Sequence, residues 1–494
     1  MASAGLLKIL SSGLQDERLV SKGQPSTEFF QTVFIRAGRF TTEWHRIDFD
    51  NKPTFGNTAN ASIPRRGHLI TRVYLVTQLP DIITAQTTAK AVATAAGKTF
   101  AGPTIGWTNS IGHALVEEAQ ITIGGSPIDT LDGRLLEMLD EFHTPLEKTT
   151  IVNRLLGRSD NGFSPSSNQG QPVTGQTVVT PLPFWFARGD PAAALPIDAI
   201  TVDAVQMSVT FAPLANLTVS SKQITNADGL RTYASPLSAP FSYTDGTQIP
   251  GVTMPASLQL QDASLLLEYV YLDKPEANRI RLGDLTYPIV QHYAIEPVQT
   301  RKQSAARVLM RIPNPIRDLY FMVHPTDADL LNAPFLATRD LCKLPTDTVP
   351  WWPNATGLNT TEWLPLTPAF SDIESEPLQS FSLLYEGSLV RYATDCPALF
   401  RTAIQSFEQT KTPWHNKYYY HLPFGTQHEM TGVTRPMGHG NLDKIHNIEL
   451  SLQFTPGRGE VRGGNSPAYT IYVWAETYTM FRVYGGRGGL LFGY

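Results

Sequence analysis

The chain has few cysteines, no long apolar run and no strong charge of either sign. Its 494 residues include only Cys342 and Cys396, which excludes a disulfide scaffold and is typical of a reducing compartment. A single disulfide between these two cysteines is an alternative, although two free buried thiols are the preferred interpretation. No run of about eighteen apolar residues occurs, so no membrane-spanning helix is predicted. The formal net charge of −5 creates no strong field for nucleic acid or anionic lipid.

Sequence motifs of catalysis are also missing. The chain has no Gly-x-x-x-x-Gly-Lys-Ser/Thr phosphate loop, no Gly-x-Ser-x-Gly elbow and no His-x-His pair. Five of the eleven histidines lie close together, at His415, His421, His428, His439 and His446. A metal-binding cupin would need ligands that converge from adjacent strands, so polar loop and interface histidines are the better interpretation. We therefore assign no catalytic residue, no cofactor site and no metal site.

Other candidate groups have plain structural interpretations. The paired carboxylates Glu117-Glu118 and Asp140-Glu141 are typical of solvated edges, and the basic residues are scattered. The cluster Gly485-Gly-Arg-Gly-Gly489 is too near the end of the chain to open a phosphate-binding helix. We expect a flexible tail there, or a close approach to a neighbouring element.

What the chain does contain is a repeated strand pattern. Asp203-Ala-Val-Gln-Met-Ser-Val-Thr-Phe-Ala-Pro213 aligns with His446-Asn-Ile-Glu-Leu-Ser-Leu-Gln-Phe-Thr-Pro456. Ile70-Thr-Arg-Val-Tyr-Leu-Val76 aligns with Ile316-Arg-Asp-Leu-Tyr-Phe-Met322 at nearly the same offset. Each alignment alone is weak, because amphipathic strands resemble one another. Two alignments in the same order indicate one β fold used twice.

The spacing of strands and turns supports an all-β chain. Strands are predicted in both halves, at 29–35, 40–49, 69–79, 119–125, 178–186, 200–211, 265–272, 288–297, 305–312, 317–323, 417–422, 446–454 and 468–484. Long loops are expected at 84–104, 158–177, 218–259 and 340–365, and a helix at 133–142, where Leu135, Leu136, Leu139 and Phe142 have helical spacing. This pattern favours a sandwich or jelly roll over an α/β fold.

The predicted organisation is an N-terminal arm at 1–24, a first domain at 25–274, a linker at 275–287 and a second domain at 288–494. Leu6, Leu7, Ile9, Leu10 and Leu14 could form one face of a short helix in the arm. We expect this arm to pack on a neighbouring domain or subunit, with membrane-surface contact as the alternative. No signal peptide is predicted.

Two segments are dense in aromatic residues: 181–186, with Phe184 and Phe186, and 414–421, with three consecutive tyrosines. The first is expected in a sandwich core. Tyr418, Tyr419 and Tyr420 cannot all face inward on one strand, so at least one is expected to meet solvent or a partner.

Several motifs resemble the major capsid proteins of the nucleocytoplasmic large DNA viruses, in that family's order. The similar segments are Pro25-Ser-Thr-Glu-Phe-Phe-Gln-Thr-Val-Phe34, Ile63-Pro-Arg-Arg-Gly-His-Leu-Ile70, Glu118-Ala-Gln-Ile-Thr-Ile-Gly-Gly125 with Ile128-Asp129, Pro183-Phe-Trp-Phe186 with Ala194-Leu-Pro-Ile197, Tyr269-Val-Tyr-Leu-Asp273 and Phe481 to Phe492. The segment Pro436 to Ile445 departs from the family at Met437, Asp443 and Lys444, and His68 stands where Asp is common.

The resemblance implies two consecutive eight-stranded jelly rolls with long inserted loops and few short helices. It further implies a homotrimeric, pseudo-hexagonal capsomer that tiles an icosahedral shell, with loops in an outer tower. The other neighbours would be penton and minor capsid proteins, and an internal membrane near the N-terminal arm. Direct contact with nucleic acid is not expected. The location would be the virion capsid, after assembly in the host cytoplasm. A cupin-like metal-dependent enzyme or a carbohydrate-binding β-sandwich is the alternative.

Overall fold

The computed structural model describes residues 39–102, 105–158, 176–225, 231–234, 240–254, 258–337, 376–404, 410, 413, 417–425, 438–455 and 468–491. The chain divides into two compact units, Met1–Thr41 and Thr42–Tyr494. Of the first unit, only residues 39–41 belong to the described residues. The predicted N-terminal arm, the strand at 29–35 and the loop at 340–365 lie outside the described residues.

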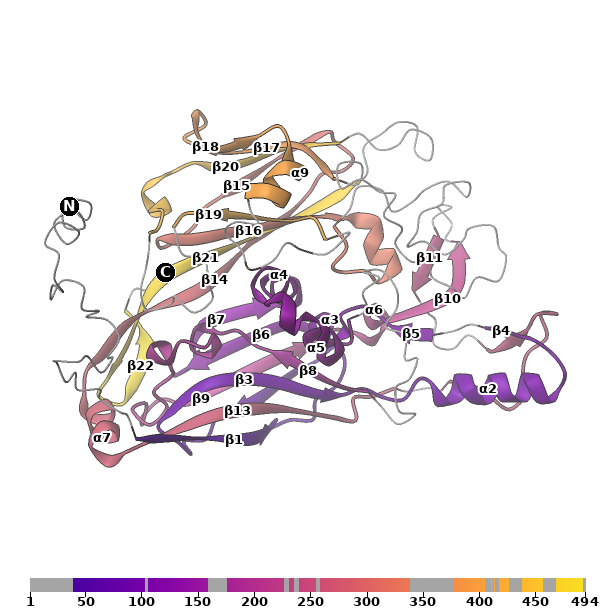
Figure 1. Cartoon of the computed structure of the whole chain (residues 1–494), viewed down its shortest axis with the longest axis horizontal. Coiled ribbons are helices and arrows are strands. Elements are labelled where there is room, and N and C mark those ends of the chain that lie inside the picture. Colours follow the sequence, from indigo (N-terminus) through magenta and orange to yellow (C-terminus); the bar gives the residue numbers. More distant parts are fainter. Residues whose placement is uncertain are drawn as a thin grey trace, which may run out of the picture. The chain divides into compact units, whose positions relative to one another are not determined.

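Strands of the first half form two four-stranded sheets (Figure 1). Sheet I has the order β1-β13-β3-β8, and sheet II has the order β2-β9-β6-β7. The strands are β1 (Phe40–Asp48), β2 (Thr58–Ser62), β3 (Leu69–Gln78), β6 (Val116–Ile123), β7 (Ser126–Asp132), β8 (Thr177–Pro181), β9 (Val205–Phe211) and β13 (Asp262–Leu272). The chain crosses repeatedly between the two sheets, which is the connectivity of a jelly roll.

The second half repeats this strand order. Sheet III is β14-β21-β16-β19, with β22 added beside β21, and sheet IV is β15-β20-β17-β18. The strands are β14 (Leu285–Gln299), β15 (Ala305–Met310), β16 (Ile316–Pro325), β17 (Leu378–Tyr385), β18 (Leu389–Thr394), β19 (Tyr419–Pro423), β20 (Ile448–Phe454), β21 (Tyr469–Tyr484) and β22 (Arg487–Leu490). Sheet III corresponds to sheet I strand by strand, and sheet IV to sheet II. The predicted double jelly roll is therefore confirmed.

Both sequence repeats fall on corresponding strands. The segment 203–213 contains β9 and the segment 446–456 contains β20, and each strand is second in its sheet. The other pair, 70–76 and 316–322, lies in β3 and β16, which are third in sheets I and III. The first jelly roll ends with β13 and the second begins with β14. The exact residue limits predicted for the two domains stay a prediction.

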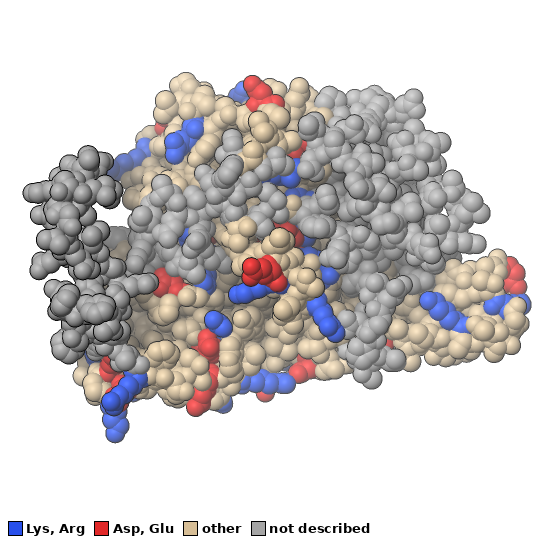
Figure 2. All heavy atoms as spheres, viewed as in Figure 1, with Lys and Arg blue, Asp and Glu red and all other residues tan. Residues whose placement is uncertain are grey.

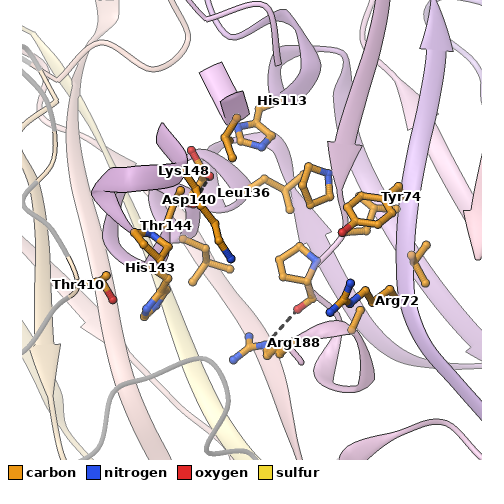
Figure 3. Close-up of a pocket in the computed structure, with 18 residues that line it drawn as sticks. Arg72, Tyr74, His113, Leu136, Asp140, His143, Thr144, Lys148, Arg188 and Thr410 are labelled. Atoms are coloured by element: carbon orange, nitrogen blue, oxygen red, sulfur yellow. Dashed lines mark hydrogen bonds between the residues drawn. The ribbon is translucent and has the colours of Figure 1, made fainter. Parts of the chain in front are cut away.

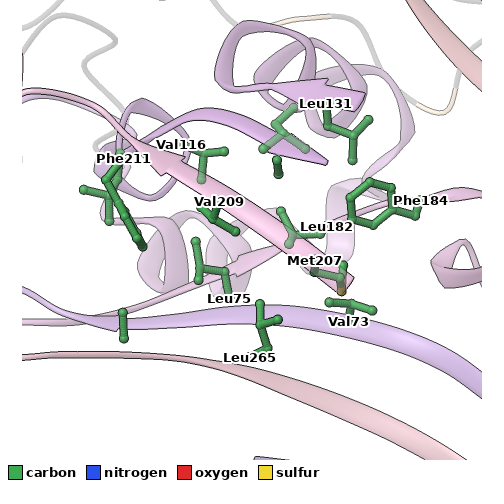
Figure 4. Packing of buried hydrophobic residues seen from close by; sticks show 14 of the residues in the cluster. Val73, Leu75, Val116, Leu131, Leu182, Phe184, Met207, Val209, Phe211 and Leu265 are labelled. Carbon is green, nitrogen blue, oxygen red and sulfur yellow. The ribbon is translucent and has the colours of Figure 1, made fainter. Parts of the chain in front are cut away.

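Alternating apolar side chains build one core in each jelly roll. In the first, Val73 and Leu75 of β3 face Met207 and Val209 of β9, and Leu265 of β13 lies beside them (Figure 4). The second core is a separate cluster between sheets III and IV that includes Leu319, Phe321, Leu450 and Leu452. Alternation puts every second side chain on the core face, which is why such strands form a sandwich.

Two predicted loops are in fact folded together. The segment 84–104 contains α2 (Thr84–Ala95) and β4 (Phe100–Gly102), and 218–259 contains β10 (Thr218–Thr225), β11 (Arg231–Ala234) and β12 (Ser242–Tyr243). β12 pairs with β4, and β10 pairs with both β11 and β5 (Ile105–Trp107). The loop prediction was wrong because a search for two-residue alternation overlooks a helix and very short strands. Figure 1 shows α2 and β4 extending from the same end of the first jelly roll as β10 and β11.

A buried glutamine explains how α2 is held. Gln86, Ala89 and Ala93 are the buried side chains of the helix, at helical spacing. The amide of Gln86 donates to the carbonyl of Ile105 at 2.7 Å and accepts from its N–H at 3.0 Å. This pair of hydrogen bonds ties α2 to the start of β5.

Helices between the strands were only partly predicted. The helix expected at 133–142 is confirmed as α4 (Gly133–His143). The others are α3 (Ile111–Ala114), α5 (Leu146–Leu156), α6 (Leu214–Leu217), α7 (Lys274–Leu282) and α9 (Pro397–Leu399), with 3₁₀ turns η2 (Trp185–Ala187), η3 (Pro191–Ala193), η4 (Thr326–Leu331) and η6 (Leu442–Lys444) and a π-helical turn η5 (Phe400–Ile404). No helix of the described residues is long and apolar enough to cross a membrane.

Two predicted strand limits need correction. The strand expected at 178–186 ends at Pro181, because the prolines at 181 and 183 cannot continue a ladder and η2 follows. The strand expected at 200–211 begins only at Val205. Helix α7 occupies much of the predicted linker at 275–287, whose limits stay a prediction; its N-cap Asp273 accepts a hydrogen bond from the N–H of Lys274 at 2.9 Å. Most of the loop predicted at 158–177 lies outside the described residues.

The C-terminal glycines form a hairpin rather than a flexible tail. Gly485 and Gly486 have φ of 60° and 79° and connect β21 to β22. Positive φ at both turn residues is what a two-residue hairpin of this kind requires. A Cβ on Gly486 would meet the hydroxyl of Thr201 at 2.2 Å. The close approach to a neighbouring element is thus confirmed, and the tail prediction is wrong for 485–490.

Candidate functional site: the charged junction between the jelly rolls

Strands β16 and β19 of sheet III are buried on both faces. All ten residues of β16 and all five of β19 are buried, and neither strand keeps the alternation of a half-exposed strand. Tyr418 and Tyr420 belong to the second core, whereas Tyr419 packs in the cluster of the first jelly roll. The expectation that one of these tyrosines meets solvent was wrong, because the first jelly roll covers the outer face of sheet III. Phe184 and Phe186 are buried as predicted.

Helix α4 supplies much of the covering surface. Its N-cap Asp132 accepts from the N–H of Leu135 at 2.8 Å through one carboxylate oxygen and from the indole N–H of Trp474 in β21 at 2.6 Å through the other. A Cβ on Gly133 would approach the carbonyl oxygen of His113 to 2.3 Å, so only glycine fits this start. At the other end Phe142 packs on the ring of Tyr320, with centroids 5.8 Å apart.

A carboxylate of the second jelly roll lies at the centre of the first charged cluster. Glu476 of β21 accepts from Arg188, which follows η2, at 2.9 Å, and from Arg317 of β16 at 3.0 Å. Its side chain is 1% exposed. Burial alone would raise the pKa of Glu476, but the guanidinium groups of Arg188 and Arg317 hold that pKa well below its usual range.

A histidine links this cluster to β7. The Nδ1 of His292 in β14 lies 3.1 Å from the carboxylate of Asp129, which also accepts the backbone N–H of His292 at 3.0 Å. The Nε2 lies 2.7 Å from Nη2 of Arg188. Because guanidinium only donates, Nε2 accepts there and Nδ1–H donates to Asp129. Arg188 and Asp129 of the first jelly roll are thereby joined to Glu476 and His292 of the second.

A second cluster surrounds Glu137 of α4. Arg158 donates to Glu137 at 2.6 Å and to Asp140 at 2.5 Å, and the Nδ1 of His113 lies 2.5 Å from Glu137. Lys417, two residues before β19, also donates to Glu137, and it donates to Glu141 at 2.9 Å. Burial would raise the pKa of Glu137, but the charges of Arg158 and Lys417 lower it well below its usual value.

Sequence reasoning missed this junction. Glu141 is buried in an ion pair, and Asp140 is bonded to Arg158, so the solvated-edge interpretation of these two was wrong; Glu117 and Glu118 are exposed as predicted. A usable signal was present in β21, where Glu476 is the one acidic residue of a sixteen-residue strand. Lys417 beside three tyrosines is a similar signal.

The predicted histidine group does not converge. His421 is buried in β19 and lies 2.9 Å from Asp318, whereas His439 and His446 are exposed; His415 and His428 lie outside the described residues. No group of three or more metal-ligating side chains occurs in the described part of the chain. Cys396 is a free thiol, but it is exposed rather than buried, and Cys342 lies outside the described residues.

The junction can hold the two jelly rolls in a fixed orientation. Its described residues form no arrangement of nucleophile, base or metal ligands that would support catalysis. Its charged groups are satisfied by one another across two domains, and removal of one member would leave a buried charge unpaired. Such an arrangement determines how one jelly roll is oriented on the other. Its chemical role is therefore structural: it makes a rigid two-sandwich block.

Comparisons with known proteins identify the same architecture. The family described as "Major capsid protein N-terminus" matches residues 28–273. The major capsid protein of Pyramimonas orientalis virus is 24% identical over 494 residues, which cover 99% of each chain. Capsid protein 1 of Acanthamoeba polyphaga mimivirus is 26% identical over 327 residues, 65% of this chain; the match spans only 48% of that relative.

Solved capsid structures share the fold. The PBCV-1 virus capsid chain superposes with a TM-score of 0.64 at 19% identity, covering 94% of this chain and 100% of that one. The Faustovirus major capsid protein gives a TM-score of 0.64 at 14% identity, covering 98% and 97%. The matched family and the major capsid protein of Pyramimonas orientalis virus support a structural role and not the cupin-like or carbohydrate-binding alternative. The chain belongs to the family of major capsid proteins of the nucleocytoplasmic large DNA viruses, which are structural proteins rather than enzymes.

Proposed function

We propose that this chain assembles as a homotrimer and that the trimer is the pseudo-hexagonal tile of an icosahedral capsid. The observation that carries the proposal is the same eight-strand order used twice in one chain, with the two sandwiches joined by a buried charged junction. Three such chains around a threefold axis present six sandwiches of one type. A threefold ring of duplicated domains therefore has nearly sixfold edges.

Exposed apolar side chains support self-association. A threefold contact is heterologous, so it joins two different surfaces of the chain. Large apolar side chains are exposed in both jelly rolls, including Phe40 and Ile151 in the first and Leu309 and Leu389 in the second, each more than 60% exposed. Burial of such groups between subunits would stabilise the trimer by about 25 cal/mol per Å² of apolar surface.

Charge on the visible surface supports a protein tile rather than a nucleic-acid platform. Lysine and arginine side chains are interspersed with aspartate and glutamate on the face shown in Figure 2. Mixed charges allow weak, salt-dependent contacts between neighbouring tiles, and weak contacts let misplaced tiles dissociate. We accordingly propose no direct contact with nucleic acid.

Finer assignments follow from the same proposal. The elements α2, β4, β5 and β10 to β12 contribute to the outer tower or to contacts within the trimer, and the N-terminal arm at 1–24 lies toward the inner face of the shell near an internal membrane. Penton and minor capsid proteins are the further partners, and assembly takes place in the host cytoplasm. The domain limits 25–274 and 288–494 mark the two sandwiches of each chain.

The test is the mass and outline of the purified full-length protein. We expect light scattering to give the mass of three 54.5 kDa chains, and negative-stain images of the same fraction to show a six-lobed particle. A single-chain mass at all concentrations used would sink the trimer proposal. A trimer with three lobes rather than six would contradict the equivalence of the two jelly rolls.

A further inference from the structure

The first jelly roll contains a cavity that the capsid role does not use. It lies between β3, the end of β8, and helices α4 and α5, and its volume is about 580 Å³ (Figure 3). Its apolar wall includes Leu136 and Leu139 of α4, Val152 of α5 and Leu182 after β8. A volume of this size falls within the ~300–1,000 Å³ range of small-molecule sites.

Most charged groups around the cavity are already neutralised. Asp140 is bonded to Arg158 at 2.5 Å, and Arg188 is bonded to Glu476 at 2.9 Å. His113 is bonded to Glu137 at 2.5 Å. Burial is the main reason that the pKa of His143 falls to about 3, so this side chain is neutral at physiological pH. The cavity wall thus holds no unpaired negative charge among the described residues.

Two cations remain available to a ligand. Lys148 of α5 is exposed at the mouth of the cavity and has no ion pair with any described residue, and Figure 3 shows its side chain pointing into the cavity. Arg72 of β3 also lines the cavity; its side chain is 52% exposed and lies 3.5 Å from Glu268, so it is only loosely paired. An apolar cavity with a cationic entrance complements a molecule that has an apolar tail and an anionic head.

We propose that this cavity binds a single-chain anionic amphiphile, with its alkyl chain against the α4–α5 wall and its carboxylate or phosphate accepting from Nζ of Lys148. A fatty acid and a lysophospholipid headgroup supply the same chemistry. The proposal concerns one chain and does not depend on the threefold assembly.

The experiment is a calorimetric titration of the full-length protein in its native oligomeric state. The probes are dodecanoate, dodecyl phosphate and dodecyltrimethylammonium, each below the concentration at which it forms micelles. We expect one saturable site per chain for at least one anion. The cation should bind at least about tenfold more weakly than that anion. Tighter binding of dodecanoate would indicate a fatty acid, and tighter binding of the phosphate a phospholipid source. Equal binding of anions and cation, or no saturable site, overturns the proposal.

Three variants separate the site from general adsorption. Lys148→Gln is expected to weaken anion binding about tenfold and to remove the preference over the cation, because only the charge at the entrance is lost. Val152→Trp should abolish binding of all three probes by filling the cavity. Arg154→Gln is the matched control, since Arg154 is exposed on the same helix and does not line the cavity. Wild-type affinity in Lys148→Gln overturns the proposal, and an unchanged circular dichroism spectrum verifies folding.

Discussion

Strands β3 and β16 hold the same place in the two jelly rolls but have opposite surroundings. Both are third in their sheets, and Tyr74 aligns with Tyr320. Tyr74 is half-buried beside Trp44, whereas Tyr320 is 1% exposed between α4 and His421. The difference comes from α4 and β7, which cover sheet III, while no other sheet covers the outer face of sheet I in the described structure. One strand pattern therefore serves both a surface and an internal interface.

The partner strands show the same contrast in charge. The register pairs Arg72 with Glu268 in sheet I and Asp318 with Glu476 in sheet III, so the two glutamates are equivalent. Glu268 has a half-exposed arginine at 3.5 Å, and Glu476 has two buried ones at about 3 Å. A surface pair contributes about 0–1 kcal/mol, while breaking a buried one costs about 3–5 kcal/mol. This matched pair gives the sharpest test of the junction.

We expect Glu476→Gln to have the largest effect. The change leaves Arg188 buried without a countercharge and leaves Arg317 with Asp318 alone, so the free energy of unfolding should fall by about 3–5 kcal/mol. Urea denaturation at fixed protein concentration measures it. The control Glu268→Gln should cost about 1 kcal/mol or less. Similar losses for the two variants would show that the junction is no more important than a surface pair.

The tyrosine pair should give the next largest difference. Tyr320→Ala opens a cavity beside Phe142 and His421, at a cost of about 4 kcal/mol, while Tyr74→Ala should cost about 1 kcal/mol. The same denaturation experiment compares them. Equal costs would contradict the claim that only sheet III is covered on both faces.

Acid should weaken the covered face through His143. Its folded pKa of about 3 lies below the ordinary 6.5, so the unfolded chain takes up the proton first as the pH falls. Stability is therefore complete above about pH 6.5 and decreases between that pH and 3. At pH 5 this single group accounts for about 2 kcal/mol. His143→Gln should reduce the drop between pH 7.5 and pH 5 by that amount, and an unchanged drop would rule out this role.

The smallest effect is expected at Asn332. This residue follows η4 with φ of 51° and donates through its amide to the carbonyls of Ala215 at 2.7 Å and Thr218 at 2.6 Å, joining the second jelly roll to the folded inserts of the first. Asn332→Gly keeps the positive φ but loses both hydrogen bonds, so we expect a loss of about 1–2 kcal/mol. A more stable variant would mean that these bonds do not hold the inserts.

Local pattern predicted the strands and their duplication well. Alternating apolar residues in β9 and β20 determine which side faces the core, and this needs no knowledge of distant segments. The same alternation search failed for α2, whose alanines have high helix propensity but little apolar contrast. It also gave no partner for the carboxylates of α4, since Lys417 lies more than 270 residues away along the chain.

The sequence pattern by itself determined a β fold used twice, because side-chain alternation and turn residues act over a few neighbouring positions. Only the tertiary structure decided that Tyr320, Glu476 and Lys417 are buried, because burial on the second face of sheet III depends on where the other jelly roll docks. An acidic residue in a strand has the same local pattern whether it meets water or an arginine from another domain. Desolvation and charge pairing are properties of the assembled fold, and so the junction appears only there.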